Sequence, residues 1–212
     1  MPVPNTTAGV VPAINWNDAW NENGAQSSAT VNNLWDNSGA NSGASITYSS
    51  SDTWQINWGN PARDADGTYN RDLLNGYIDS GSPASTRIAI SSIPYSSYEI
   101  IVYLSSDVSG RTGTVNVGST TYDFSTMGSA AISGVNALFT QSTDTTGANP
   151  TADYVIFSGL TGSSQTITSL VSGGGGMPGF QIVATPEPGT LALAVMGGIG
   201  MFTLGRRFKA RS

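Results

Sequence analysis

Tyr98-Glu99-Ile100-Ile101-Val102-Tyr103-Leu104 is the stretch of this 212-residue chain that decides its fold. Successive side chains of a β-strand point to opposite faces, and here both alternating sets are largely apolar. The run therefore predicts a central strand that is buried on both faces. Tyr154-Val155-Ile156-Phe157 predicts a second buried strand for the same reason.

Outward from this run, residues 14–184 form short segments rich in Tyr, Ile, Val, Thr and Phe, separated by turn clusters. Side chains of these types fit a pleated, half-buried surface. The expected strands are 45–49, 53–58, 86–91, 98–105, 113–117, 120–124, 137–141, 153–158, 165–170 and 180–183. About ten short strands with regular turn signals predict an all-β fold, a β-sandwich or jelly roll.

Three connecting segments have signals of their own. Val117-Gly118-Ser119-Thr120 has the spacing of a tight hairpin turn between two strands. Residues 70–77 predict one short helix, with Leu73, Leu74 and Tyr77 on its inner side. The four glycines at 173–176 predict a flexible loop before the last strand.

Charge restricts the partners. Only 10% of the residues are charged, against roughly 25% in typical soluble domains. Residues 1–185 hold four Arg against thirteen Asp and Glu, which gives this part a net charge near −9. Nucleic-acid binding requires Lys and Arg in number, so no nucleic-acid partner is expected. Divalent cations and neutral sugars remain as partners.

Two residue types are missing from the sequence, Cys and His. Their absence excludes Ser-His-Asp and Cys-His catalysis, and any zinc site that uses thiolate or imidazole. Glycosidases need two carboxyl groups roughly 5 to 9.5 Å apart. The body has only two Glu, and Glu99 lies in the expected central strand, which leaves Asp pairs such as Asp64 and Asp66 as the alternative. We therefore expect a protein that is not an enzyme.

The C-terminal region has three parts in a fixed order. Pro186, Glu187 and Pro188 are followed by residues 189–205, which carry no charge, and then by a basic cluster of Arg206, Arg207, Lys209 and Arg211. As a single hydrophobic helix the middle part would span roughly 25 Å, less than the bilayer core of about 30 Å. The basic cluster predicts a cytoplasmic C-terminus and an exported body. The alternative is a buried core helix or an apolar tail.

This three-part order closely resembles the PEP-CTERM sorting signal of bacterial surface proteins. The resemblance implies recognition at Pro186, Glu187 and Pro188 by an exosortase, a membrane transpeptidase, while residues 189–205 hold the chain in the membrane before processing. The expected organisation is a flexible segment 1–12, a β-sandwich domain 13–184 and a sorting signal 185–212. Residues 1–14 do not resemble the signal peptide that the family normally carries, so we expect a start codon upstream of Met1 or a truncated gene model.

The body has a fainter resemblance, which covers residues 14–183. Core and turn segments resemble bacterial surface proteins with PEP-CTERM tails, whose domain is similar to galactose-binding-like jelly rolls. The segments are Asn15-Trp16-Asn17, Asn32-Asn33-Leu34, Asp36-Asn37-Ser38-Gly39, 72–77, 98–103, 154–159 and 179–183. They imply a fold and identify no ligand.

All five Trp, at positions 16, 20, 35, 54 and 58, lie in the first 58 residues. Indole rings can stack on sugar faces, and the alternative for each is a place in the core. Trp54, Ile56 and Trp58 would share one face of a strand, which favours packing. Trp16 and Trp20 lie among Asn and Asp residues, so these two are the predicted sugar-binding residues.

Asp64, Asp66, Asn70 and Asp72 concentrate oxygen-bearing side chains in one segment. Ca²⁺ binds six to eight oxygen ligands, so the segment is a candidate calcium site. It departs from the EF-hand loop, with Tyr69 where Gly is required and Asn75 where Glu is expected. The alternative is an acidic surface loop in which Asp72 caps the following turn. No other cofactor is expected.

These observations together predict a non-catalytic protein of the cell surface or extracellular matrix, sorted by an exosortase and associated with exopolysaccharide. Two alternatives stay open. One is a carbohydrate-binding module with a defined glycan, and the other is a structural surface protein that assembles with copies of itself.

Overall fold

The computed structural model describes residues 2–3, 6–19, 26–57, 63–80 and 85–186, and these form a mostly β structure. The strands are β1 (Pro2–Val3), β2 (Trp16–Asn17), β3 (Gln26–Val31), β4 (Ser45–Ser50), β5 (Asp52–Gln55), β6 (Gly76–Asp79), β7 (Thr86–Ser91), β8 (Tyr98–Tyr103), β9 (Ser109–Val117), β10 (Thr120–Met127), β11 (Tyr154–Leu160), β12 (Gln165–Val171), β13 (Gly176–Met177) and β14 (Phe180–Ala184). Two short helices, α1 (Asn70–Asn75) and α2 (Ala130–Ser133), complete the list.

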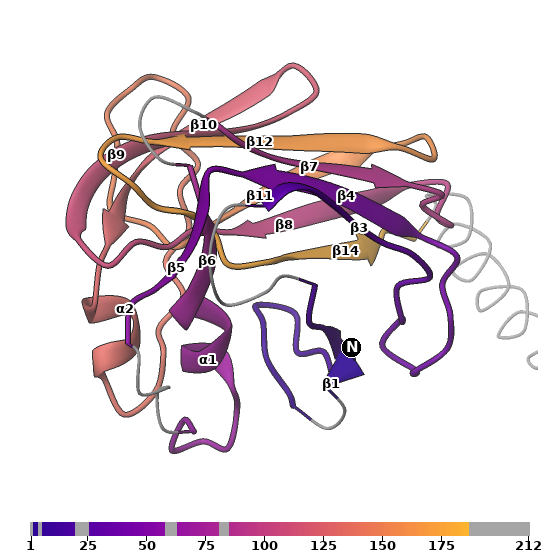
Figure 1. Cartoon of the computed structure of the whole chain (residues 1–212), viewed down its shortest axis with the longest axis horizontal. Helices are drawn as coiled ribbons and strands as arrows, with labels where there is room; N and C mark the ends of the chain where they lie inside the picture. Colours follow the sequence, from indigo (N-terminus) through magenta and orange to yellow (C-terminus); the bar gives the residue numbers. More distant parts are fainter. Residues whose placement is uncertain (1, 4–5, 20–25, 58–62, 81–84, 187–212) are drawn as a thin grey trace, which may run out of the picture.

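Two antiparallel sheets face each other across the main core (Figure 1). One has six strands in the order β10-β9-β12-β7-β4-β3, and the other has three in the order β11-β8-β14. The inner sides of both sheets supply apolar side chains to one cluster. Its members include Ile46, Tyr48, Ile88, Ile90, Val115, Phe124 and Ile167 from the first sheet and Tyr98, Ile100, Val102, Val155 and Phe157 from the second. This layering is consistent with the predicted β-sandwich.

Strand β8 is buried on both faces, as its sequence predicted. Tyr98, Ile100 and Val102 point into the main core. Ile101 and Tyr103 point to the other side, where a second cluster covers them with apolar residues of α1 and α2. The apolar character of both alternating sets therefore has one cause, because β8 lies between a sheet and a layer of helices.

The glycine run before the last strand is a correction to the prediction of a flexible loop. Gly174, Gly175 and Gly176 are buried, and the last of them begins β13, which pairs with β6. Gly176 also forms a bridge with Ser105, immediately after β8. A Cβ atom at position 176 would lie 1.9 Å from the Ile78 carbonyl oxygen. Glycine is needed here because two backbones approach closely.

Several other expectations are settled by the pairing. The hairpin turn at Gly118 and Ser119 is confirmed, since Val117 pairs with Thr120. The expected strand 137–141 is wrong, because only Gln141 forms a bridge there, an isolated one to Tyr154. The strand expected at 53–58 ends at Gln55. The unpredicted elements are β1, β2, β3, β6, β13 and α2. The helix expected at 70–77 ends at Asn75, and Tyr77 lies in β6 instead.

Residues 6–12, which precede the predicted domain boundary at residue 13, contact the rest of the described structure. Ala8 is buried and forms a bridge with Ala13. The Gly9 N–H donates to Asn70 Oδ1 at 2.8 Å, and the Val10 N–H donates to the Tyr103 hydroxyl at 2.7 Å. These bonds attach the segment to α1 and β8.

At the other end, the structure describes the chain as far as Pro186, which is exposed. Glu187, Pro188, the expected apolar helix 189–205 and the basic residues Arg206, Arg207, Lys209 and Arg211 lie outside the described residues. Within the described ranges, no helix is long and apolar enough to cross a membrane.

Candidate functional site

A groove of about 490 Å³ lies beside strand β14. Segments from the early and the late parts of the described chain meet there. The longer lining segments are 13–19, 34–37, 53–55, 75–77 and 178–182, and the single residues are Thr6, Ala8, Ser42, Ala44, Ile46, Tyr69, Asp72, Leu73, Pro94 and Tyr95. Cavities of this volume are typical of small-ligand sites.

Three tryptophans line this groove, which we call the tryptophan groove. Trp35 and Trp54 keep 45% and 39% of their surface exposed, and Trp16 is half-buried. The predicted packing of Trp54 in the core is therefore wrong: it is Thr53, its neighbour in β5, that is buried. Trp20 and Trp58 lie outside the described residues.

Trp16 is the most firmly packed of the three. Its ring meets the Tyr103 ring edge-on, with 6.2 Å between centroids. Its indole N–H donates to the Ala13 carbonyl at 3.0 Å, so the polar edge is satisfied within its own loop. The predicted sugar-binding residue Trp16 thus lines the groove while it also holds the N-terminal segment against β8.

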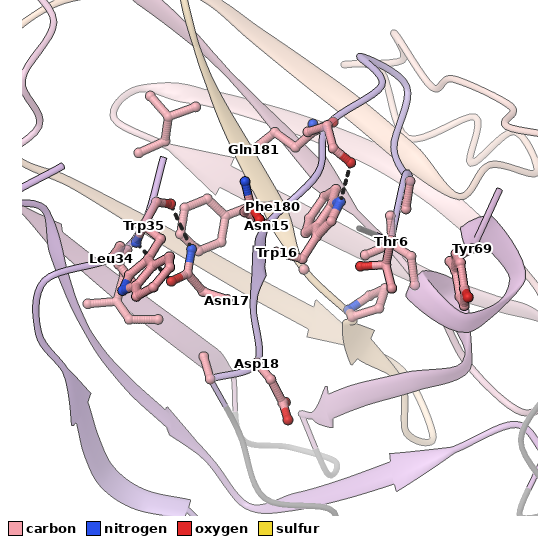
Figure 2. A pocket seen from close by; sticks show the side chains of 18 of the residues that line it. Thr6, Asn15, Trp16, Asn17, Asp18, Leu34, Trp35, Tyr69, Phe180 and Gln181 are labelled. Atoms are coloured by element: carbon pink, nitrogen blue, oxygen red, sulfur yellow. Dashed lines mark hydrogen bonds between the residues drawn. The ribbon is translucent and has the colours of Figure 1, made fainter. Parts of the chain in front are cut away.

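Trp35 is held through its backbone by Asn17. The Asn17 Nδ2 donates to the Trp35 carbonyl at 2.9 Å, and the Trp35 N–H donates to Asn17 Oδ1 at 2.9 Å. Figure 2 shows this pair on one side of the groove, with Trp16 and Thr6 on the other. Because the amide bonds only the backbone, the Trp35 side chain remains exposed.

A tight turn follows Trp35 and sets its direction. Asp36 Oδ1 accepts hydrogen bonds from the Ser38 N–H at 2.8 Å, the Ser38 hydroxyl at 2.6 Å and the Ala40 N–H at 3.0 Å. These bonds, led by the Ser38 hydroxyl, lower the pKa of Asp36 below its ordinary value. Trp35 also forms a bridge with Asn41, which closes the turn.

A second asparagine pair ties this turn to the N-terminal segment. The Ile14 N–H donates to Asn37 Oδ1 at 2.6 Å, and Asn15 Nδ2 donates to the Asn37 carbonyl at 3.1 Å. Asn15 has a φ of 61°, a left-handed conformation that Asn adopts more readily than most residues. Together with the Asn17–Trp35 pair, these bonds make one rigid wall from two segments about twenty residues apart.

The opposite wall is held by Tyr103 and Gln181. The Tyr103 hydroxyl donates to Gln181 Oε1, and Gln181 Nε2 donates to the Val11 carbonyl at 2.8 Å. Burial raises the pKa of the Tyr103 phenol, so it stays protonated and able to donate. Gly9 lies against these groups, and its φ of 99° is in the region that favours glycine.

The predicted calcium segment has its oxygens directed to different partners. Asp64 is buried, and its two oxygens accept from the Ala137 N–H at 2.6 Å and the Arg71 N–H at 3.0 Å. Asp66 Oδ1 accepts from Thr68, and Asn70 Oδ1 accepts from Gly9. Asp72 lines the tryptophan groove. Across the described ranges, no group of three or more Asp or Glu is placed to hold a metal ion.

Sequence reasoning missed Trp35, Trp54, Asn15 and Asn17 as groove residues. A usable signal existed for Trp35, because a turn-forming Asp36-Asn37-Ser38-Gly39 follows it and turns lie at the surface. None existed for Asn17, whose partner is eighteen positions away. Comparison of the chain with protein-family models, with curated proteins and with solved structures found no match.

Proposed function

We propose that the described domain is a non-catalytic carbohydrate-binding module, carried by an exported protein of the cell surface or matrix. The observation that supports it best is the tryptophan groove, in which two exposed indole rings and one half-buried ring line the same cavity. Large apolar rings gathered in an open cavity mark a ligand site more often than single exposed ones do, so two exposed Trp and one half-buried Trp at one cavity point to a stacking partner.

Sugar rings suit this chemistry. The C–H face of a pyranose packs on an indole ring, while its hydroxyls seek amide and carboxylate partners. Asn15, Asn17 and Asn37 lie beside the rings, and Asp18 and Asp36 supply acceptors. Because the walls are held by side chain–backbone bonds, the rings are pre-organised, which lowers the entropic cost of binding.

Affinity electrophoresis through gels that contain single polysaccharides tests this proposal. We expect retardation of the native chain by at least one of them, and loss of retardation in Trp35→Ala and Trp54→Ala. Leu138→Ala is a matched control, because Leu138 is also a large exposed apolar side chain but does not line the groove. Equal mobility of the native chain in every gel, with and without sugar, would rule the function out.

Export and sorting form a separate part of the proposal, which rests on Pro186, Glu187, Pro188 and the residues after them. An exosortase would cleave near Pro186–Pro188 and release the body to an exopolysaccharide matrix. Mass spectrometry of the protein extracted from the cell surface is the test. We expect a mature form without residues 206–212, and a surface form that retains them would contradict cleavage.

A further inference from the structure

We infer, on the basis of the proposed carbohydrate-binding function, that the tryptophan groove selects an amino-sugar chain with free ammonium groups and rejects uronate or sulfated chains. Among the described residues that line the groove, the charged ones are all acidic: Asp18, Asp36 and Asp72. The groove and its rings form the site, and the carboxylates decide which sugars enter it.

The arginines of the described ranges do little to neutralise these carboxylates. Arg71 Nε donates to the Ile132 carbonyl at 2.8 Å, and Arg111 pairs with Asp107 at 2.9 Å. Arg87 lies on β7, which does not line the groove. The Arg63 guanidinium lies 5.0 Å from the centre of the ring of Tyr69, which lines the groove, but Arg63 itself does not line it. The described side chains that line the groove therefore carry three negative charges and no positive one.

Solvent reaches all three carboxylates. Asp18 and Asp72 are exposed, and Asp36 is half-buried. The hydrogen bonds from Ser38 and Ala40 hold the pKa of Asp36 below its ordinary value, so this group remains ionised in mildly acidic media. Figure 2 shows Asp18 next to Asn17, with its carboxylate turned away from the Asn17–Trp35 pair.

The rings and the carboxylates favour the same charge. An ammonium group is attracted to the face of an indole ring, and Trp is the best of the aromatic side chains for this interaction. It is also attracted to each carboxylate, whereas a uronate or sulfate would be repelled by them. A neutral sugar would stack without either effect. The expected order of affinity is ammonium-bearing above neutral, and neutral above anionic.

Isothermal titration of the full chain with three oligosaccharides of matched length tests this order. The probes are oligomers of glucosamine, of N-acetylglucosamine and of galacturonic acid. We expect the glucosamine oligomer to bind about tenfold more tightly than the N-acetylated one at about 20 mM NaCl. The difference should largely vanish at about 300 mM NaCl, where the Debye length falls to ~6 Å.

Variants separate the groove from the overall negative charge. Asp18→Asn combined with Asp72→Asn should remove most of the preference for glucosamine over N-acetylglucosamine, measured as the ratio of the two Kd values in the same variant. Glu99→Gln is the control, since it removes one charge outside the groove and should keep the preference. Loss of the preference in Glu99→Gln to the same degree would show non-specific attraction, and would overturn the inference.

The failures of the two proposals are distinguishable. Equal binding of all three oligomers, abolished by Trp35→Ala, would overturn the charge selection and keep the carbohydrate-binding function. Tighter binding of the galacturonate oligomer would do the same. Absence of binding to any saccharide would remove the function itself.

Discussion

Asn17 binds the backbone of Trp35 twice, with both hydrogen bonds 2.9 Å long. The Asn17 amide thus bonds the Trp35 N–H and C=O as the backbone of a paired strand would. The orientation of an exposed ring is thereby determined by a residue that need not touch the ligand. This makes Asn17 a positioning residue, separable by experiment from the rings themselves.

Replacing Asn17 with Ala should weaken saccharide binding while the domain stays folded. Two partly exposed hydrogen bonds are lost, at a cost of about 1 kcal/mol in unfolding free energy. We expect Kd to rise about tenfold, because Trp35 loses its fixed backbone position. Asn116→Ala is the control: its amide also bonds a turn, through the Gly118 and Thr120 carbonyls, but lies outside the groove. An equal rise in Kd in both variants would contradict a positioning role.

Two of the groove tryptophans, Trp16 and Trp35, should differ in their effect on stability. Trp16→Ala removes a half-buried ring that packs on Tyr103 and an indole hydrogen bond to Ala13, so we expect a loss of about 2–4 kcal/mol. Trp35→Ala removes an exposed ring and should change stability by less than about 0.5 kcal/mol. Urea denaturation of both variants measures the difference, and similar midpoints would show that Trp16 has no structural role.

Much of the sandwich could be predicted from the sequence, for reasons that differ between elements. β8 was identifiable because its residues alternate between two buried faces, and the β9–β10 hairpin because Gly118 adopts a φ of 60° that a tight turn requires. Strand β3 could not be identified from the sequence, since its residues Gln-Ser-Ser-Ala-Thr-Val have little apolar content. The groove could not be predicted for a different reason. Its walls come from residues 6–19 and 178–182, which are distant in sequence and meet only in the folded domain.

Asp153 should make the stability of the protein depend on pH. The side chain is 1% exposed, and its Oδ2 has no hydrogen-bond partner within the described ranges, while Oδ1 accepts from the Thr140 N–H at 2.7 Å. Burial raises the pKa of this carboxyl from 3.8 to about 7. The folded state therefore holds a proton that the unfolded state has released above about pH 4.

The stability that this proton provides is present in full below about pH 4 and is lost as the pH rises through 7. We expect the unfolding free energy to increase by on the order of 3 kcal/mol between about pH 8 and about pH 4.5. Asp153→Asn should flatten this slope. Asp66→Asn should not, because hydrogen bonds from Thr68 lower the pKa of Asp66 and confine its effect to more acidic pH. Denaturant titrations across this range give the slopes, and a slope that survives in Asp153→Asn would contradict the assignment.

Gly9→Ala should destabilise the N-terminal wall of the groove. A Cβ atom at this position would lie 2.6 Å from Gln181 Oε1 and 2.9 Å from the Tyr103 hydroxyl oxygen, and φ is 99°. We expect a loss of about 2–3 kcal/mol in unfolding free energy. Gly162→Ala isolates the backbone contribution, because φ is 86° there but no atom lies within 4 Å of the added Cβ. Its expected cost is about 1 kcal/mol, and an equal cost at both positions would exclude the steric contact.

Strand β14 also decides how the domain responds to mechanical load. When the chain beyond Ala184 is pulled, the hydrogen bonds between Thr185 and Ser97 bear the load first. The pair of Ala184 with Tyr98 bears it next. The ladder peels from that end, so the pair of Phe180 with Val102 opens last. Phe180 lines the groove. A ligand bound there would stabilise the strand at the pair that opens last. Sugar binding would then raise the force that is needed to detach β14.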